Sequence, residues 1–417
     1  MFKKQTFKNG IRLVAAPLKE TQTASLLVLF KVGSRQEAGP IEGMSHFVEH
    51  LMFKGTKKRP TTLDLSKELD GIGAEYNAYT GKDVTGYHIK ADARHLPLAI
   101  DMLSDMLTDS LFCAEEIEKE KGVIVEEINM YEDNPLMFVE QMLEEMIFRG
   151  GELAHLIAGS AKTVRSLDRR KILQYRQKYY VGSNMVIGLA GKFTIQHIKE
   201  LQKKFVFDKG RKSTIKKLAN RQKAPRVKVK FKDSEQAQLA LGWPAFSHHD
   251  KRVFALQLLS VILGGNMSSR LFINVREKRG LAYFVRAWPN LYDDAGSLVI
   301  QAGLDKSRLD EAIGVILAEL DKLKTDVSEE ELSRAKEFIA GKLALEMEDS
   351  MSLAQWYVNL ELLGKKLVTP EDRLKKIMAV KLPEIKKVAR ELFNLRHANL
   401  AVIGPFKDRD RFLKMLK

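Results

Sequence analysis

Short apolar runs bounded by glycine and polar residues alternate along this chain with longer segments in which apolar residues recur every three or four positions. Runs of the first kind are typical of strands, and segments of the second kind are typical of amphipathic helices. In the first half of the chain the pattern predicts strands at residues 10–16, 25–32, 86–91 and 184–191. In the second half it predicts strands at residues 238–242, 297–303 and 399–404, with a helix at 253–263. The pattern therefore indicates that one succession of elements occurs twice.

A basic segment lies between the two series of predicted elements. Residues 208–225 are rich in lysine and arginine, and we interpret them as a linker. The two halves end on similar apolar strands, residues 186–191 and 400–404, which suggests an internal duplication. The sequence thus predicts an α+β fold with two structurally similar, sandwich-like domains, residues 1–207 and 226–417, each a mostly antiparallel sheet covered by helices.

Composition narrows the class of protein without deciding its activity. With 417 residues, 45% of them hydrophobic, the chain is long enough for two globular cores. Its one cysteine, Cys113, excludes a disulfide within the chain. Residues 1–10 do not read as a secretory signal, and no stretch reaches the roughly 18 apolar residues that a membrane helix needs. We therefore expect a cytoplasmic protein that does not enter membranes.

The formal net charge of +15 raises the question of an acidic partner. The basic residues are spread along the chain, and their densest run, residues 209–217, lies in the predicted linker. No zinc-finger, helix-turn-helix or aromatic RNA-binding motif accompanies them. We therefore expect no nucleic-acid partner, and a preference for acidic or neutral peptides agrees better with the charge.

The segment His46-Phe47-Val48-Glu49-His50 carries the clearest candidate chemistry. Residues four apart on a helix share one face, so His46 and His50 can offer two imidazole nitrogens to one zinc ion. Glu49 would then stand beside the metal, where it can take a proton from the attacking water without being a ligand. This order inverts the more common His-Glu-x-x-His motif and is a known zinc peptidase signature.

A catalytic zinc usually takes three protein ligands, and residues 113–133 supply the candidates for the third. This segment has a helical period, and Glu120 and Glu127 lie beside its apolar stripe whereas Glu126 points away. A carboxylate at the edge of a buried face needs a cation or a donor. We interpret Glu127 as a ligand and Glu120 as a residue that orients one; the alternative is a solvated acidic helix, which would be preferred without the histidines.

These motifs resemble the pitrilysin and insulinase family of inverted zinc peptidases, in particular its short-chain branch with the mitochondrial processing peptidase subunits and their bacterial relatives. Glu127 stands 77 residues after His50, which is the spacing that the resemblance assigns to the third ligand. Glu120, seven residues before Glu127, matches the glutamate that supports a ligand in that family.

The resemblance extends to two further segments. Residues 77–80, Asn77-Ala78-Tyr79-Thr80, resemble the family's strand that lies beside the zinc and pairs with bound peptide. In the second half, Arg276 and Tyr283 match an Arg and a Tyr, seven apart, that reach the substrate and the tetrahedral intermediate. The resemblance therefore implies a zinc-binding catalytic domain at residues 1–207 and a domain carrying the Arg/Tyr motif at 226–417.

Function, cofactor and partners follow from the resemblance as expectations. It implies a zinc endopeptidase with one Zn²⁺ per chain, although manganese or cobalt would also suit these ligands. Peptides or unfolded segments would bind as an added strand inside a dimeric chamber. A homodimer is sufficient because both signatures occur in one chain; a heterodimer with an inactive homologue is the alternative, as is a non-catalytic peptide-binding or scaffold subunit.

Overall fold

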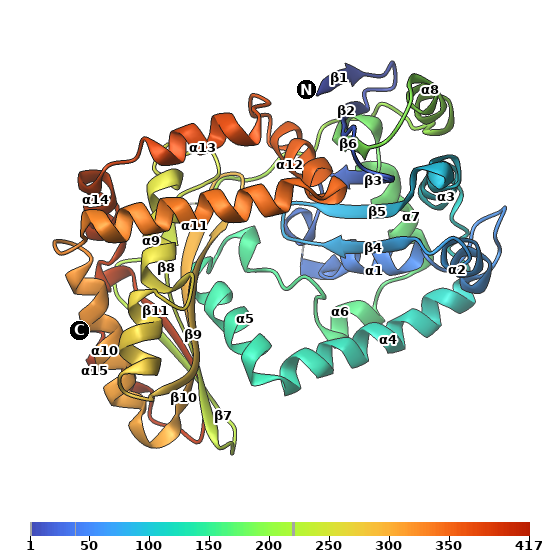
Figure 1. Cartoon of the computed structure of the whole chain (residues 1–417). Coiled ribbons are helices and arrows are strands. Elements are labelled where there is room, and N and C mark those ends of the chain that lie inside the picture. The colour runs from blue at the N-terminus through green and yellow to red at the C-terminus, as the bar shows by residue number, and fades with distance from the viewer. Residues whose placement is uncertain (1, 38, 219–221) are drawn as a thin grey trace. The chain divides into compact units, whose positions relative to one another are not determined.

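The computed structural model describes residues 2–37, 39–218 and 222–417 of the chain. These residues form two compact units, and each unit is assembled from three separate segments (Figure 1). The first unit comprises Met1–Asn129, His155–Lys216 and Leu343–Thr369. The second comprises Met130–Ala154, Lys217–Lys342 and Pro370–Lys417. Every helix among the described residues is too short or too polar to cross a membrane.

A six-stranded sheet forms the centre of the first unit. Its spatial order is β1-β2-β6-β3-β5-β4, and only the β2–β6 pair is parallel. The strands are β1 (Lys3–Thr6), β2 (Arg12–Pro17), β3 (Thr23–Phe30), β4 (Glu75–Thr80), β5 (Thr85–Asp92) and β6 (Met185–Gly191). β4 is therefore an edge strand that has a hydrogen-bonded neighbour, β5, on one side only.

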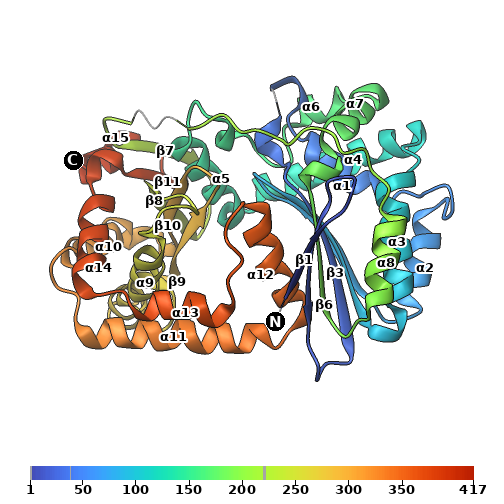
Figure 2. The same cartoon turned by 90° about the horizontal axis from the view of Figure 1, so that it is seen from above.

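Helices cover both faces of this sheet. One face packs on a large apolar core with helices that include α1, α3, α7 and α8, whereas the other face packs on α12 (Figure 2). The helices of this unit are α1 (Met44–Leu51), α2 (Thr62–Asp70), α3 (Leu96–Asp109), α6 (Ala161–Arg165), α7 (Arg169–Tyr179), α8 (Ile195–Lys204) and α12 (Ser350–Leu362), with most of α4 (Ala114–Asp133). Because Val358 and Ala354 of α12 meet Gly188, a side chain at that position would collide with the helix.

The second unit contains a five-stranded sheet with the order β7-β11-β8-β10-β9. Its strands are β7 (Arg226–Phe231), β8 (Gln236–Ala245), β9 (Ala282–Leu291), β10 (Gly296–Asp305) and β11 (Asn399–Gly404). Its helices are α5 (Pro135–Ile147), α9 (Val253–Gly264), α10 (Leu309–Lys322), α13 (Pro370–Met378), α14 (Leu382–Leu392) and α15 (Arg409–Met415), with most of α11 (Glu329–Met347) and the π-helical turn η6 (Phe272–Glu277). The helix α5 covers one face, and α9, α10 and α14 cover the other.

The two sheets repeat one design. Strands β2 to β6 and strands β7 to β11 occupy corresponding places in their sheets, and in each sheet the first and last of the five form the parallel pair. The expectation of two similar α+β domains with mostly antiparallel sheets is confirmed. The strand that corresponds to β4 is β9, which is likewise an edge strand.

The two units are not simply the first and second halves of the chain, because one segment from each half belongs to the other unit. Residues 130–154, which precede the basic segment, belong to the second unit, and residues 343–369, which follow it, belong to the first. The cause is packing: the apolar side of α5 lies on the second sheet and that of α12 lies on the first. The described part of residues 208–225 has no helix or strand, and the chain passes there from one unit to the other.

Candidate metal centre

The helix α1 starts at a tight loop that a buried carboxylate holds in place. Glu37 accepts hydrogen bonds from the backbone nitrogens of Gly43 and Ser45, each at 2.7 Å. Gly43 has a φ of +90°, and a Cβ there would lie 2.6 Å from the carbonyl oxygen of Ala158, so the loop requires glycine. Burial raises the pKa of Glu37 to about 8. Glu37 thus fixes the point at which the helix with both histidines begins.

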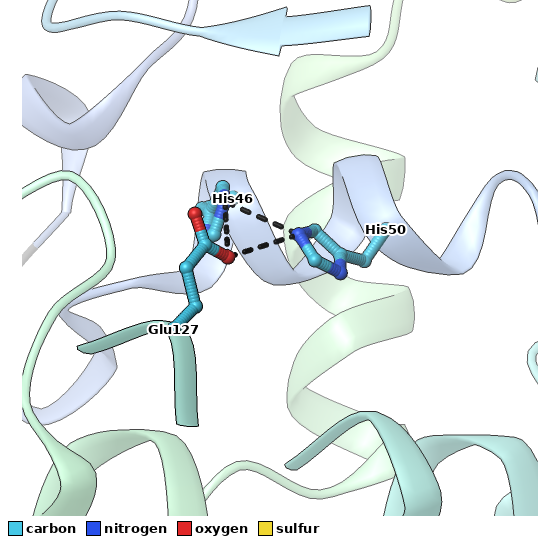
Figure 3. A group of neighbouring side chains, drawn as sticks. All are labelled: His46, His50 and Glu127. Atoms are coloured by element: carbon cyan, nitrogen blue, oxygen red, sulfur yellow. Dashed lines mark hydrogen bonds and ion pairs between the residues drawn. The ribbon is translucent and has the colours of Figure 1, made fainter. Parts of the chain in front are cut away.

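Three side chains converge beside α1 (Figure 3). His46 and His50 extend from the same side of α1, and Glu127 reaches them from α4. The two Nε2 atoms are 3.2 Å apart, and Glu127 Oε2 lies 3.5 Å from each of them. The structure therefore brings together the three residues that the sequence motif and the helix pattern select as ligands.

The spacing of these atoms fits one zinc ion. With bonds of about 2.0–2.1 Å, two ligand atoms of a tetrahedral zinc site are about 3.3 Å apart. The three observed separations of 3.2, 3.5 and 3.5 Å lie close to that value. Two imidazoles and a carboxylate also match the two-histidine, one-glutamate set of several zinc peptidases. Among the described residues, no other group of histidine, cysteine, aspartate and glutamate meets this geometry.

A second carboxylate orients one of the two histidines. His50 Nδ1 donates to Glu120 Oε2 at 2.9 Å, which leaves Nε2 directed at His46 and Glu127. Lys54 Nζ holds the other oxygen of Glu120 at 2.6 Å. The Glu120 side chain is only 4% exposed, and its burial is offset by these two bonds, which lower its pKa. His46 has no comparable partner, because its Nδ1 is buried without a hydrogen bond to any described residue.

The two histidines differ in their affinity for a proton. Burial, together with the neighbouring His50, lowers the pKa of His46 to about 4. Burial also disfavours the charged form of His50, but hydrogen bonds to Glu120 and Glu127 outweigh it and raise its pKa to about 9. A divalent cation held by these residues would favour the neutral form of both imidazoles, so metal binding would release a proton from His50.

Glu49 lies on α1 beside this cluster and has a partner from the sheet. Thr80 Oγ1 donates to Glu49 Oε2 at 2.5 Å, from the last position of β4. Burial raises the pKa of Glu49, and the hydrogen bond from Thr80 works in the opposite direction. The structure therefore places the expected proton acceptor next to the ligands and connects it to the edge strand.

The predicted peptide-binding segment forms most of that edge strand. Asn77, Ala78, Tyr79 and Thr80 are the last four residues of β4, and side chains alternate between the two faces of the sheet. Ala78 packs on the core that contains α1, whereas the Tyr79 hydroxyl donates to Gln355 of α12 at 2.9 Å. Since β5 is the only strand paired with β4 among the described residues, the opposite edge of the β4 backbone can accept another strand.

Arg276 and Tyr283 belong to the second unit, not to the unit with the candidate metal ligands. Arg276 lies in η6 with its guanidinium 4.8 Å from the centre of the Phe272 ring. Tyr283 lies at a β-bulge, because Gly303 pairs with Phe284 and the next residue, Leu304, pairs with Ala282. The bulge directs the Tyr283 side chain outward and leaves it 74% exposed, as bulges near binding sites often do.

Three contacts that support the centre have no signal in the sequence: those of Glu37, of Lys54 and of the Thr80 side chain. Glu37 and Lys54 stand nine residues before His46 and four residues after His50, and no pattern in the sequence distinguishes them from other charged residues. The side-chain contact of Thr80 with Glu49 was also not expected, since Thr80 entered only as part of a peptide-binding strand. Only the packing of α1 against β4 and α4 shows these roles.

Comparisons with known proteins agree on one family. The family model described as insulinase, peptidase family M16, matches residues 13–161, and the model described as peptidase M16 inactive domain matches residues 166–339. An uncharacterized zinc protease of Streptomyces coelicolor is 34% identical over 98% of this chain and 90% of its own length. The uncharacterized zinc protease YmxG of Bacillus subtilis is 35% identical over 97% of this chain and 98% of its own length.

Solved structures show the same fold at lower identity. A protease from Helicobacter pylori aligns over 97% of this chain and 99% of its own with a TM-score of 0.90 at 22% identity. A structure of complex III from Candida albicans contains a chain that aligns over 99% of both with a TM-score of 0.86 at 18% identity. The described fold is therefore shared by a protein named a protease and by a chain in the structure of complex III.

Proposed function

This chain belongs to the insulinase family, peptidase family M16, and from that premise we propose that it is a zinc-dependent endopeptidase acting on peptides or unfolded polypeptide segments. The observation that carries the proposal is the cluster of His46, His50 and Glu127 with Glu49 beside it. The relatives named zinc proteases support zinc as the ion, with one ion per chain.

His46, His50 and Glu127 would hold the ion, which when bound supplies Lewis-acid chemistry by lowering the pKa of water and polarising the scissile carbonyl. Glu49 accepts the proton of the attacking water on its carboxylate and delivers it to the leaving amine. The raised pKa of Glu49 suits this role, since a base that later acts as an acid must hold the proton for part of the reaction.

The free edge of β4 would bind the substrate. A peptide in extended conformation can pair with the backbone of Asn77, Ala78 and Tyr79, so main-chain hydrogen bonds supply affinity with little dependence on sequence. A globular substrate has few free extended segments, which favours peptides and unfolded chains. The edge strand and the helix of the zinc ligands both belong to the first unit.

Arg276 and Tyr283 would donate hydrogen bonds to substrate carbonyls or to the developing oxyanion. We propose that the chain pairs with a second copy to form a chamber in which these two residues act on the partner's centre. A heterodimer with an inactive homologue is the alternative assembly. The exposure of Tyr283 supports a role in contacting another molecule.

A non-catalytic subunit is the second candidate function. The name "inactive domain" belongs to the match at residues 166–339, a segment that contains none of the three ligands. The retention of both histidines, Glu127 and Glu49 in the other half favours the enzyme.

The test is cleavage of a quenched fluorescent peptide library by the purified protein, with bound metal measured in the same sample. We expect activity that chelation removes and zinc restores. The Glu49→Gln variant should bind one metal ion per chain and lose at least about a hundredfold in activity. Full metal content without cleavage by the wild-type chain would instead support the non-catalytic subunit.

A further inference from the structure

One hydrogen bond connects the substrate-binding edge of the first unit to its proton acceptor. Thr80 is the last residue of β4, and its side chain lies on the same face of the sheet as Tyr76 and Ala78, toward α1. The neighbouring Tyr79 faces α12 instead. Thr80 is therefore the member of this strand whose side chain reaches the base.

The position of the Thr80 hydroxyl is fixed by its surroundings. Thr80 pairs with Thr85 of β5, and the turn between them is closed by a hydrogen bond from Gly81 N to the Val84 carbonyl at 2.7 Å. The Thr85 hydroxyl takes no part in this turn, because it donates to the Val32 carbonyl at 2.9 Å. A hydroxyl held on such a turn constrains the carboxylate that accepts from it.

The two oxygens of Glu49 thus differ. Thr80 donates to Oε2 at 2.5 Å, and no other side-chain hydrogen bond to this carboxylate is found among the described residues. A carboxylate that must take and return a proton needs one oxygen oriented toward the reacting water. A donor on Oε2 fixes the rotation of the group and leaves Oε1 for that proton.

We propose that Thr80 is a positioning residue for Glu49, and this inference rests on the function proposed above. Through its hydroxyl, the edge strand that binds the peptide also orients the base. The contribution of Thr80 is then to the rate of the chemical step and not to the binding of substrate or metal.

The first test compares two substitutions of Thr80. Thr80→Val keeps the shape of the side chain but loses the donor, and we expect kcat to fall about tenfold to a hundredfold with KM unchanged. Thr80→Ser keeps the donor and should recover most of kcat. Metal content should stay at the wild-type level in both. A rise in KM with kcat unchanged would overturn the proposal and return Thr80 to peptide binding alone.

Thr85→Val is the matched control. It removes a hydroxyl from the residue directly opposite Thr80, whose partner is a main-chain carbonyl and not Glu49. We expect a lower unfolding midpoint and an unchanged kcat. An equal loss of kcat in Thr85→Val would show that the turn is merely structural and would contradict the assignment.

A second measurement does not depend on activity. Denaturation midpoints of the metal-free wild type, Thr80→Val, Glu49→Ala and the double variant form a double-mutant cycle, and residues in contact give shifts that do not add. Additive shifts would overturn the contact. If the wild-type protein cleaves nothing but the cycle is non-additive, the proposed peptidase function fails while the Thr80–Glu49 contact stands.

Discussion

In the candidate metal centre, the hydrogen bond between Glu120 and His50 fixes the direction in which the His50 imidazole faces the metal position. Glu120 accepts from His50 Nδ1 and is itself held by Lys54, so the imidazole cannot rotate without breaking a buried charged hydrogen bond. A partner of this kind usually adds affinity by fixing both the tautomer and the orientation of the ligand.

We expect Glu120→Gln to weaken zinc binding about tenfold to a hundredfold, because the amide is a poorer acceptor for Nδ1–H and leaves Lys54 without its carboxylate. The measurement is a competition titration against a chromophoric chelator at pH 7. Glu118→Gln is the control, since Glu118 lies on the same helix with a side chain 70% exposed and should not change the affinity. Equal affinities of Glu120→Gln and wild type would show that the His50 contact is incidental.

The sequence was sufficient to select the candidate ligands, but it did not identify the residues that hold them and Glu49 in place. Helical spacing places His46 and His50 on one face, and the apolar stripe of α4 separates Glu120 and Glu127 from Glu126, which is exposed in the structure. These are relations within one helix. The contacts of Lys54, Glu37 and Thr80 join residues from different elements, and a single sequence does not contain that information.

At the scale of elements, a charge network joins three helices of the first unit. Arg59, whose side chain is 3% exposed, donates from Nε and Nη2 to the two carboxylate oxygens of Glu68 of α2. It also binds Asp101 and Asp105 of α3, and all four contacts are 2.8 Å long. Lys204 of α8 binds the other oxygen of Asp101. Burial opposes ionisation of Asp101, but hydrogen bonds from Lys204, Lys58 and Arg59 outweigh it and hold its pKa well below the usual range.

The sign of the pH effect follows from that shift. A carboxylate whose folded-state pKa is depressed stabilises the protein above its unfolded-state pKa, and this stabilisation is lost as pH falls through the folded-state value. We expect Asp101→Asn to lower the free energy of unfolding by about 1–3 kcal/mol at pH 7. The difference from wild type should shrink steadily below pH 4, as measured by chemical denaturation at a series of pH values.

Asp109→Asn provides the comparison for this prediction. Asp109 also lies on α3, but its pairing with Lys57 at 3.6 Å involves side chains that are 45% and 77% exposed. Exposed pairs of this kind contribute little. A loss of stability in Asp109→Asn as large as that in Asp101→Asn would show that the network around Asp101 stabilises the protein no more than an exposed ion pair does.

Most central strands could be predicted at this scale, whereas several edge strands could not. The predicted strands at 86–91 and 297–303 lie within β5 and β10; β5 has no exposed position, and β10 is buried at all but its last residue. β1 consists of four exposed residues, and β7 carries three basic residues, so neither has the apolar signal of a strand. The hydrophobic pattern of the sequence does not predict that α5 packs on the second sheet and α12 on the first, because an apolar helix face does not identify the sheet that it covers.

For the whole molecule, the repeated sheet order gives equivalent places to the two segments with predicted substrate contacts. β4, with the predicted peptide-binding residues, and β9, with Tyr283, are corresponding edge strands of the two sheets. If the chain arose by duplication, the first half carries the helix with His46 and His50, and the second half carries the edge strand with the exposed Tyr283. A dimer of two copies would therefore contain two candidate metal centres and two Tyr283 side chains.

Mixing two inactive variants tests whether Arg276 and Tyr283 of one copy act on the metal centre of the other. Glu49→Gln and Tyr283→Phe chains should each be nearly inactive alone, since each lacks one part of every site. If Arg276 and Tyr283 act on the partner's centre, random reassociation should restore about a quarter of wild-type activity, because half of the dimers are mixed and each has one intact site. Purified mixed dimers without recovered activity would contradict action between subunits.

The exchange of helices also governs how this protein can be made. All six strands of the first sheet have been synthesised by residue 191, yet α12, the helix that covers one of its faces, begins at Ser350. Val14, Leu27 and Val186 therefore remain uncovered by α12 while the ribosome adds the greater part of the second unit. During that interval this apolar face lacks its covering helix, and transiently exposed apolar surface of this kind favours aggregation of a nascent chain.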